Sequence, residues 1–346
     1  MNDNILKKLN EWFPEPNIRN FWVAYIEGKI PPDINELKKL PRSAFCAELL
    51  SFLKSHGRSA QWSGAFAEAL IDKLGPWPSP EGDWDNVRQW MKSKPVIGKK
   101  PDFQHRLSLK QKEALARYGI HDLDFWTEQI ALGDRWAFLH GLQIIARQHD
   151  KADIHALDQM QLHERDRHTF ARSALDNFSG EGTVFVILHS VFRPWLLTFM
   201  REQRGNSLYT LMRRSLATVV TRNAQTVMMI KHLRKGGELI MAVDGREGRL
   251  ETELQILQSP YAVAGGASWT IWKAARRAVW LFPHESKSGT GLELVASPLP
   301  ISKNNEPFEN YNRRFISAIN DELDNCIVKH PFAFGMPAGM RKVLLG

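Results

Sequence analysis

Two short segments stand out from the hydrophobic and polar pattern of the chain. Residues Thr183 to Leu188 and Leu239 to Val243 are runs of apolar and β-branched residues, a pattern typical of strands that are buried on both faces of a parallel sheet. Each run ends at a titratable residue, His189 in the first and Asp244 in the second. Because open α/β sheets carry their chemistry at the carboxyl ends of their strands, we expect both side chains at the same edge of one sheet.

The residues around these strands predict helices. Pro194 suits the first turn of a helix after His189, because the missing N–H of proline is no loss there. Ser108, with Gln111 three residues later, matches a capping box at the start of a helical pattern that runs from Leu107 to about Arg147. A further helix is expected over Ser268–Arg277 and a strand over Ala278–Phe282. These elements predict an α/β fold, with a mainly parallel mixed sheet flanked by helices.

The first hundred residues have a different pattern. Apolar residues recur there at helical spacing, and six of the twelve tryptophans fall in this part of the chain, which predicts a packed helical region. The helical stretches are Ile5–Phe13, Ser43–Ser55, Ala60–Leu74 and Asp85–Lys94. Proline and glycine are dense around residues 75–82 and 94–101, as at a domain boundary. The pattern therefore predicts a helical N-terminal region, residues 1–100, and an α/β domain, residues 101–346.

Composition narrows the class of protein. The chain has 346 residues, of which 43% are hydrophobic and 24% charged, as in ordinary globular proteins. No apolar run approaches the roughly 18 residues that a membrane helix needs, and the N-terminus is polar, so we expect a cytoplasmic protein. Cys46 and Cys326 are far apart and have no metal-ligand spacing, which favours buried free thiols. We expect neither a metal nor a cofactor.

The chain carries a net charge of +8, which favours anionic partners such as an acidic carrier protein, a phosphorylated ligand or a membrane surface touched peripherally. The basic residues are spread along the chain, mostly in pairs such as Lys99-Lys100 and Arg213-Arg214. No basic run or nucleic-acid-binding motif is present, so we do not expect a nucleic-acid partner.

His189 and Asp244 each allow two interpretations. A histidine at a strand-to-helix junction can act as a general base near neutral pH, and the helix N-terminus beside it can stabilise an anion such as an acyl oxyanion. The alternative is a histidine that is hydrogen-bonded within the core. Asp244 stands before Gly245, and aspartate before glycine commonly serves only to form a turn.

Further features around the second segment carry a family resemblance. Lys231 and the Gly236-Gly237 pair lead into the strand that ends at Asp244, and a small-residue loop, Ala264 to Ala267, precedes the next helix. Together with the strand that ends in His189, this order and spacing resembles the lysophospholipid acyltransferase family, in the branch of the bacterial lipid A late acyltransferases. The resemblance covers about residues 160–330.

The resemblance implies transfer of an acyl group from a thioester donor, an acyl carrier protein or coenzyme A, to a hydroxyl or amine. It implies catalytic roles for His189 and Asp244, and backbone amides near Val191 to Trp195 would form an oxyanion site. Five cations are candidates for binding substrate: Arg193, Arg246, Lys273, Arg276 and Arg277. The last three also stand near a helix C-terminus, where cations stabilise the helix.

One position departs from the family pattern. Members of the family have a carboxylate five positions after the histidine, where this chain has Pro194. That carboxylate orients the imidazole and supports its protonated form, and proline can do neither. Either another acid, namely Asp244, Asp176 or Glu181, replaces it in space, or the chain has kept the fold and lost the reaction. In the second case it is a non-catalytic partner subunit or ligand-binding module.

Overall fold

The computed structural model describes residues 10, 16–27, 29, 84–93, 107–149, 170, 175, 182–204, 208–210, 222–244, 251–288 and 291–334. The chain divides into two compact units. The first consists of Met1–Ser79, Asn86–Pro101 and Arg135–Met160, and the second of Pro80–Asp85, Asp102–Asp134 and Gln161–Gly346. Within the described ranges, no helix combines the length and the apolar character that crossing a membrane requires.

The first unit contains α2 (Pro16–Ile26), most of α6 (Trp84–Ser93) and the C-terminal part of α8 (Leu123–His149). The helix expected over Asp85–Lys94 is thus present as α6. Those expected over Ser43–Ser55 and Ala60–Leu74 lie outside the described residues, and Ile5–Phe13 is described only at Asn10.

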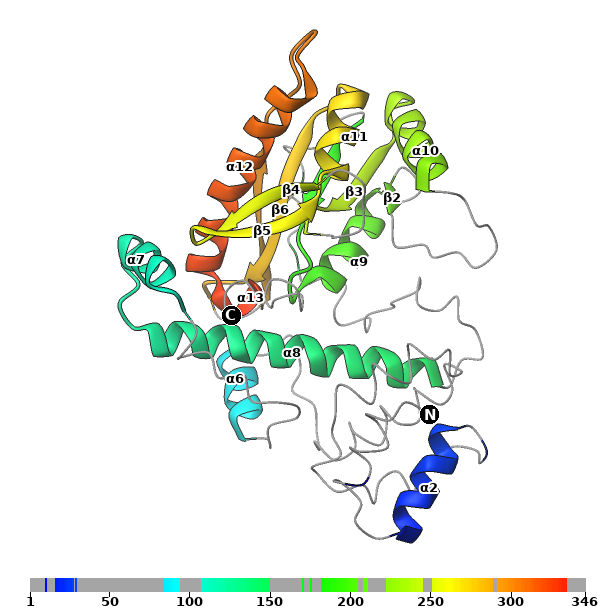
Figure 1. The fold of residues 1–346 in the computed structure, drawn as a ribbon, viewed down its shortest axis with the longest axis vertical. Helices are drawn as coiled ribbons and strands as arrows, with labels where there is room; N and C mark the ends of the chain where they lie inside the picture. The colour runs from blue at the N-terminus through cyan, green and yellow to red at the C-terminus, as the bar shows by residue number, and fades with distance from the viewer. Residues whose placement is uncertain are drawn as a thin grey trace. The chain divides into compact units, whose positions relative to one another are not determined.

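The second unit is built on a mixed sheet whose described strands run in the order β2-β3-β1-β6-β7 (Figure 1). The strands β2 (Leu208–Thr210), β3 (Glu238–Ala242), β1 (Val184–Ile187) and β6 (Ala278–Glu285) are parallel, and β7 (Leu292–Pro298) is antiparallel to β6. Every residue of the central strand β1 is buried. The unit therefore has the expected α/β fold with a mostly parallel sheet.

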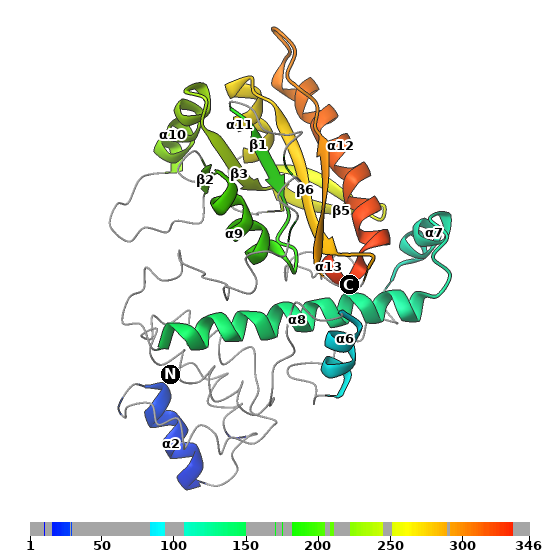
Figure 2. The ribbon, with the colours of Figure 1, turned by 180° about the vertical axis from the view of Figure 1, so that it is seen from behind.

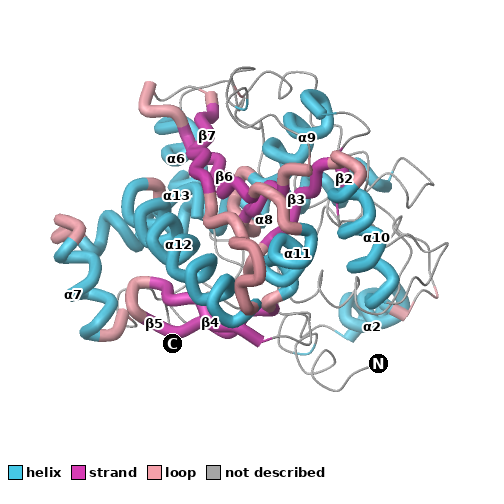
Figure 3. The backbone as a smooth tube through the Cα atoms, turned by 90° about the horizontal axis from the view of Figure 1, so that it is seen from above, coloured by secondary structure: helices cyan, strands magenta, loops and turns pink. Residues whose placement is uncertain are grey.

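Helices cover both faces of this sheet. The helix α9 (Arg193–Arg204) lies on one face, and α10 (Arg222–Arg234), α11 (Gly266–Ala274) and α12 (Phe308–Lys329) lie on the other (Figure 2, Figure 3). Burial on both faces explains why β1 and β3 are continuous apolar runs without polar alternation. The short helix α13 (Pro331–Phe334) follows α12.

The capping box at Ser108 is confirmed, and the helical pattern that follows it forms two helices. The Ser108 hydroxyl accepts a hydrogen bond from the Gln111 amide, and the Gln111 side chain accepts one from the Ser108 amide. This helix, α7 (Leu109–Arg117), ends before Gly119, whose φ of +80° is easily adopted only by glycine. A second helix, α8, then starts at Leu123.

A two-stranded hairpin, β4 (Glu251–Ile256) and β5 (Ser259–Ala264), packs beside α12 (Figure 1). Two polar side chains of α12 accept hydrogen bonds from main-chain amides of the first strand of the hairpin, β4, and of the turn after it. Asn320 accepts a hydrogen bond from the Gln255 amide at 2.9 Å, and Asp324 accepts one from the Leu257 amide at 2.8 Å. The strand edge that faces α12 is therefore satisfied by side chains.

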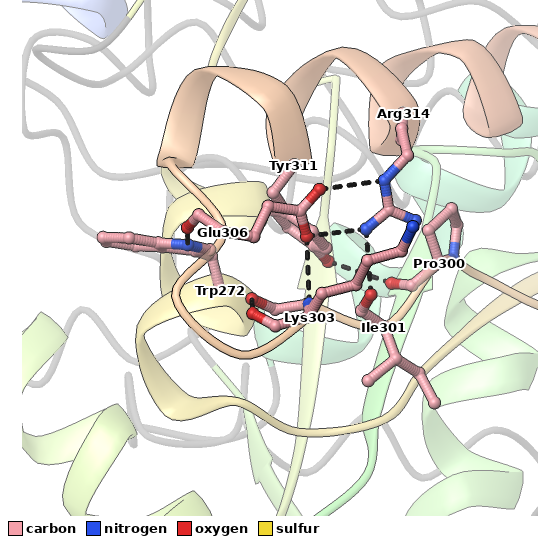
Figure 4. A network of polar contacts seen from close by, with 8 residues as sticks. Trp272, Pro300, Ile301, Lys303, Glu306, Tyr311 and Arg314 are labelled. Atoms are coloured by element: carbon pink, nitrogen blue, oxygen red, sulfur yellow. Dashed lines mark hydrogen bonds and ion pairs between the residues drawn. The ribbon is translucent and has the colours of Figure 1, made fainter.

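A polar network joins α11 to the start of α12 (Figure 4). The Glu306 carboxylate accepts hydrogen bonds from Arg314 at 2.7 and 3.0 Å and from the Lys303 amide at 2.9 Å, while its main-chain carbonyl accepts one from the Trp272 indole at 2.9 Å. The Leu299 amide, just before this loop, bonds to the carbonyl of Ala278, the first residue of β6. The network thus adjoins the amino-terminal edge of the parallel strands.

Candidate functional site

His189 and Asp244 each follow a parallel strand by two residues. The strands β1 and β3 are neighbours, with Ile187 opposite Ala242, and the pairing continues past them through a 3.0 Å hydrogen bond from the Val243 amide to the Ile187 carbonyl. This register brings His189 and Asp244 level with each other. The prediction that they lie at the same edge of one sheet is confirmed.

The Asp244 carboxylate binds His189 with both of its oxygens. One, Oδ1, lies 2.7 Å from the ring atom Nδ1, and the other, Oδ2, accepts a 3.0 Å hydrogen bond from the main-chain amide of His189. The Asp244 side chain has no exposed surface, whereas 37% of the His189 side chain is exposed. A buried carboxylate therefore holds an imidazole that solvent can reach.

The hydrogen bond determines which ring nitrogen of His189 carries the proton. An ionised carboxylate can only accept hydrogen bonds, so Nδ1 must be the donor in this contact. The neutral ring then has no proton on Nε2, which is free to accept one. A short bond to a charged acceptor is also stronger than a neutral one. The pair therefore has the arrangement of a general base with its orienting acid.

Pro194 occupies the first turn of α9, as the sequence predicts. The position five residues after His189 therefore starts a helix. The carboxylate that is hydrogen-bonded to His189 is instead that of Asp244, which follows the neighbouring strand β3. Of the three acids that could replace the missing one, Asp244 lies within hydrogen-bond distance of the ring. The other two, Asp176 and Glu181, lie outside the described residues.

The turn after His189 is fixed by aromatic packing. Phe192 has no exposed surface, and its ring lies 4.9 Å from Trp84, 5.9 Å from Trp195 and 5.9 Å from Phe332, measured between ring centroids. The Val191 amide donates a 3.0 Å hydrogen bond to the carbonyl of Ala333 in α13. Two distant segments, one with Trp84 and one with Phe332 and Ala333, thus hold the backbone that carries His189.

These contacts limit the oxyanion site expected at Val191 to Trp195. The Val191 amide is bonded to Ala333, and the Arg193 amide donates to the Ser190 carbonyl at 3.2 Å. Pro194 has no N–H to offer. Three of the five positions therefore provide no free backbone donor, and of these only Pro194 is evident from the sequence.

Arg193 lies near the His189–Asp244 pair. Burial lowers the pKa of its guanidinium, and the negative charge of Asp244 opposes part of that lowering. Each of the two Asp244 oxygens also accepts a hydrogen bond from His189. The other cation expected close to Asp244, Arg246, lies outside the described residues.

The three remaining cations lie at the opposite edge of the sheet. The Arg277 carbonyl accepts a hydrogen bond from the amide of Val184, the first residue of β1, whereas His189 follows the end of that strand. Five residues of extended chain span roughly 16 Å. Lys273, Arg276 and Arg277 therefore lie away from His189, because α11 runs back to the edge where β6 begins.

Two arginines at that edge instead bind the ends of helices. The Arg276 guanidinium donates to the carbonyl of Arg234, the last residue of α10, at 3.1 Å. The Arg234 guanidinium donates to the carbonyl of Lys273, near the end of α11, at 3.2 Å. These bonds satisfy carbonyls that have no partner within their own helix. The helix-stabilising interpretation thus has direct support in the contacts of Arg276.

Some contributors to the site could not be assigned from the sequence. The buried Tyr261 hydroxyl donates to the main-chain carbonyl of Asp244 at 3.5 Å, the upper limit for a hydrogen bond. Trp84 and Phe332 support the turn after His189 from distant parts of the chain. Aromatic residues give no local signal of such a partnership, because it depends on tertiary packing.

Among the described residues, no group of three or more histidine, cysteine, aspartate or glutamate side chains could hold a metal ion. Cys326 is a buried free thiol, as expected, and burial raises its pKa to about 12. Such a thiol is neither a metal ligand nor a nucleophile at neutral pH. Cys46 lies outside the described residues.

Comparison with known proteins gives no assignment. No protein-family model matches the sequence, and no curated protein matches it either.

Proposed function

We propose that the chain is an acyltransferase, which moves an acyl group from a thioester donor, an acyl carrier protein or coenzyme A, to a hydroxyl or amine. The observation that carries this proposal is the 2.7 Å contact between His189 Nδ1 and the buried Asp244 carboxylate. It supplies the orienting acid that Pro194 cannot provide. The acyltransferase resemblance in the sequence supplies the reaction class.

In the proposed reaction, Nε2 of His189 removes the proton from the acceptor hydroxyl or amine as the acceptor attacks the thioester carbonyl. A C–O or C–N bond forms, and the C–S bond breaks when the tetrahedral intermediate collapses. The imidazolium then returns the proton to the leaving thiolate, so that free thiol is released. Asp244 keeps Nδ1 protonated throughout and stabilises the charged ring.

The rest of the proposal follows from the sequence. The protein works in the cytoplasm without a cofactor, and its basic surface brings it to an acidic carrier or, peripherally, to an anionic membrane surface. Lys273, Arg276 and Arg277 would contact a carrier protein away from the reacting atoms. The helical N-terminal region, residues 1–100, would supply most of the first compact unit.

The test compares thioester consumption by wild type, His189→Ala and Asp244→Asn, with acyl-carrier-protein and coenzyme A thioesters as donors. Removing a general base should lower transfer by about 100-fold or more, and the aspartate substitution should lower it by a similar order because the ring loses its fixed tautomer. His121→Ala is the matched control, because His121 is exposed in the turn between α7 and α8. It should leave transfer unchanged.

Two outcomes would contradict the proposal. Equal turnover by wild type and His189→Ala would eliminate His189 as the base. No turnover by wild type across a broad panel of donors would favour the non-catalytic alternative, a partner subunit or ligand-binding module. Circular dichroism of each variant separates a loss of chemistry from a loss of fold.

A further inference from the structure

The turn after His189 carries two hydrogen-bond donors that have no partner. Among the described residues, the Nε of Arg193 and the hydroxyl of Ser190 are enclosed atoms without a hydrogen bond. Ser190 is only 7% exposed, so water does not replace a protein partner freely. Buried polar groups are nearly always paired in native proteins, and those that are not require an explanation.

The charge of Arg193 lies close to that of Asp244. Asp244 is the carboxylate that acts on it, and both oxygens of Asp244 are bonded to His189. Arginine remains protonated in proteins and presents a planar fork that matches the oxygens of a carboxylate or phosphate. The guanidinium therefore lies close to Asp244, and its Nε–H is a donor without an acceptor.

We propose that Arg193 and Ser190 form a subsite for an anionic oxygen group of the substrate, a phosphate or a carboxylate. The inference rests on the proposed acyl transfer for its claim that the bound anion belongs to a substrate. Arg193 supplies the charge, Ser190 supplies a second donor from the preceding turn, and the 3.2 Å bond between the Arg193 amide and the Ser190 carbonyl fixes the two residues relative to each other.

The bound anion has a consequence for the histidine. Without it, the charges of Asp244 and Arg193 cancel, and a proton taken up by His189 leaves the group with a net positive charge. With an anion at Arg193, the same proton transfer ends at neutrality. Because opposite charges attract each other, an anionic substrate favours the protonated ring that the reaction requires.

Binding is measured by isothermal titration calorimetry of the full chain, with inorganic phosphate and acetate as probes. A hydrogen-bonded charge contact is expected to change affinity by about tenfold. Arg193→Gln should therefore weaken phosphate binding about tenfold or more, and Ser190→Ala by less. Arg193→Lys should fall between wild type and Arg193→Gln, because it keeps the charge and loses the fork. Arg313→Gln removes an exposed arginine from α12 and should change nothing.

A second comparison locates the anion on the substrate. If Arg193 binds the phosphate of the donor arm, then pantetheine 4′-phosphate will bind more tightly than pantetheine, and Arg193→Gln will abolish the difference. If it binds an anion of the acceptor, Arg193→Gln will leave that difference intact while it still weakens phosphate binding.

Absence of phosphate and acetate binding to wild type would overturn the subsite, as would equal weakening by Arg193→Gln and Arg313→Gln. Arg193→Lys keeps the test valid if the glutamine variant fails to fold. The measurement needs no turnover. Anion binding through Arg193 in a chain that transfers no acyl group would therefore refute the proposed function alone, whereas acyl transfer by a chain that binds no anion would refute the subsite alone.

Discussion

Phe192 offers the most direct test of how the turn after His189 is held. Its side chain is fully buried and contacts three aromatic rings, with the Trp84 ring 4.9 Å away at an interplanar angle of 66°. Truncating a buried phenylalanine to alanine costs about 3–5 kcal/mol, and edge-to-face aromatic pairs add about 0.5–1.5 kcal/mol beyond burial. We therefore expect Phe192→Ala to lower the free energy of unfolding by about 4 kcal/mol. Phe192→Leu, which keeps most of the volume, should cost about 1.5 kcal/mol.

The assay is urea unfolding followed by tryptophan fluorescence, to which Trp84 and Trp195 contribute directly. Phe125→Ala is the matched control, because 59% of Phe125 is exposed, and it should change the free energy by no more than about 0.5 kcal/mol. Hydrogen exchange adds a local reading, since the Val191 amide, bonded to Ala333, should lose protection in Phe192→Ala. A loss below about 1 kcal/mol, or an equal loss in the control, would refute the packing argument.

Two further predictions concern the edge around α13. Burial, assisted by the nearby charge of His284, lowers the pKa of His330 to about 4 from its ordinary 6.5. The unfolded chain therefore takes up this proton first, so stability should be complete above about pH 6.5 and fall as the pH drops toward 4. His330→Phe should flatten this dependence in urea titrations between pH 7 and 5, and an unchanged slope would contradict it. A methyl group at Gly133 would overlap the carbonyl oxygen of Phe332, so Gly133→Ala should cost about 2 kcal/mol or more. Gly266→Ala, where the methyl group meets nothing within 4 Å, should be nearly neutral. Urea unfolding of both variants checks this, and equal losses would count against the overlap.

Features determined by neighbouring residues could be predicted from the sequence. The two apolar runs become β1 and β3 within about a residue of their expected ends, and the Ser108–Gln111 capping box forms as its spacing requires. Parallel strands buried on both faces leave a continuous apolar signature, and their carboxyl ends meet at one edge. These local rules were sufficient to place His189 and Asp244 at the same edge of one sheet.

Features that depend on distant residues or on unusual turns could not be predicted. The hairpin β4–β5 turns at Leu257 and Gln258, which both have a positive φ, and neither is a glycine or asparagine that would signal such a turn. The choice of Asp244 among three acids depends on β3 lying next to β1, which is a property of strand order. The direction of α11 likewise has no local signal. This helix runs back toward the amino-terminal edge of the parallel strands, and Lys273 therefore lies at the edge opposite His189.

The separation of His189 from its carboxylate also bears on how the protein is made. The two residues are 55 positions apart, so a growing chain emerges from the ribosome with the histidine long before its acid. Until β3 pairs with β1, the imidazole has no fixed tautomer. The reactive state of the ring is thus a product of completed strand pairing, and a half-made chain lacks it.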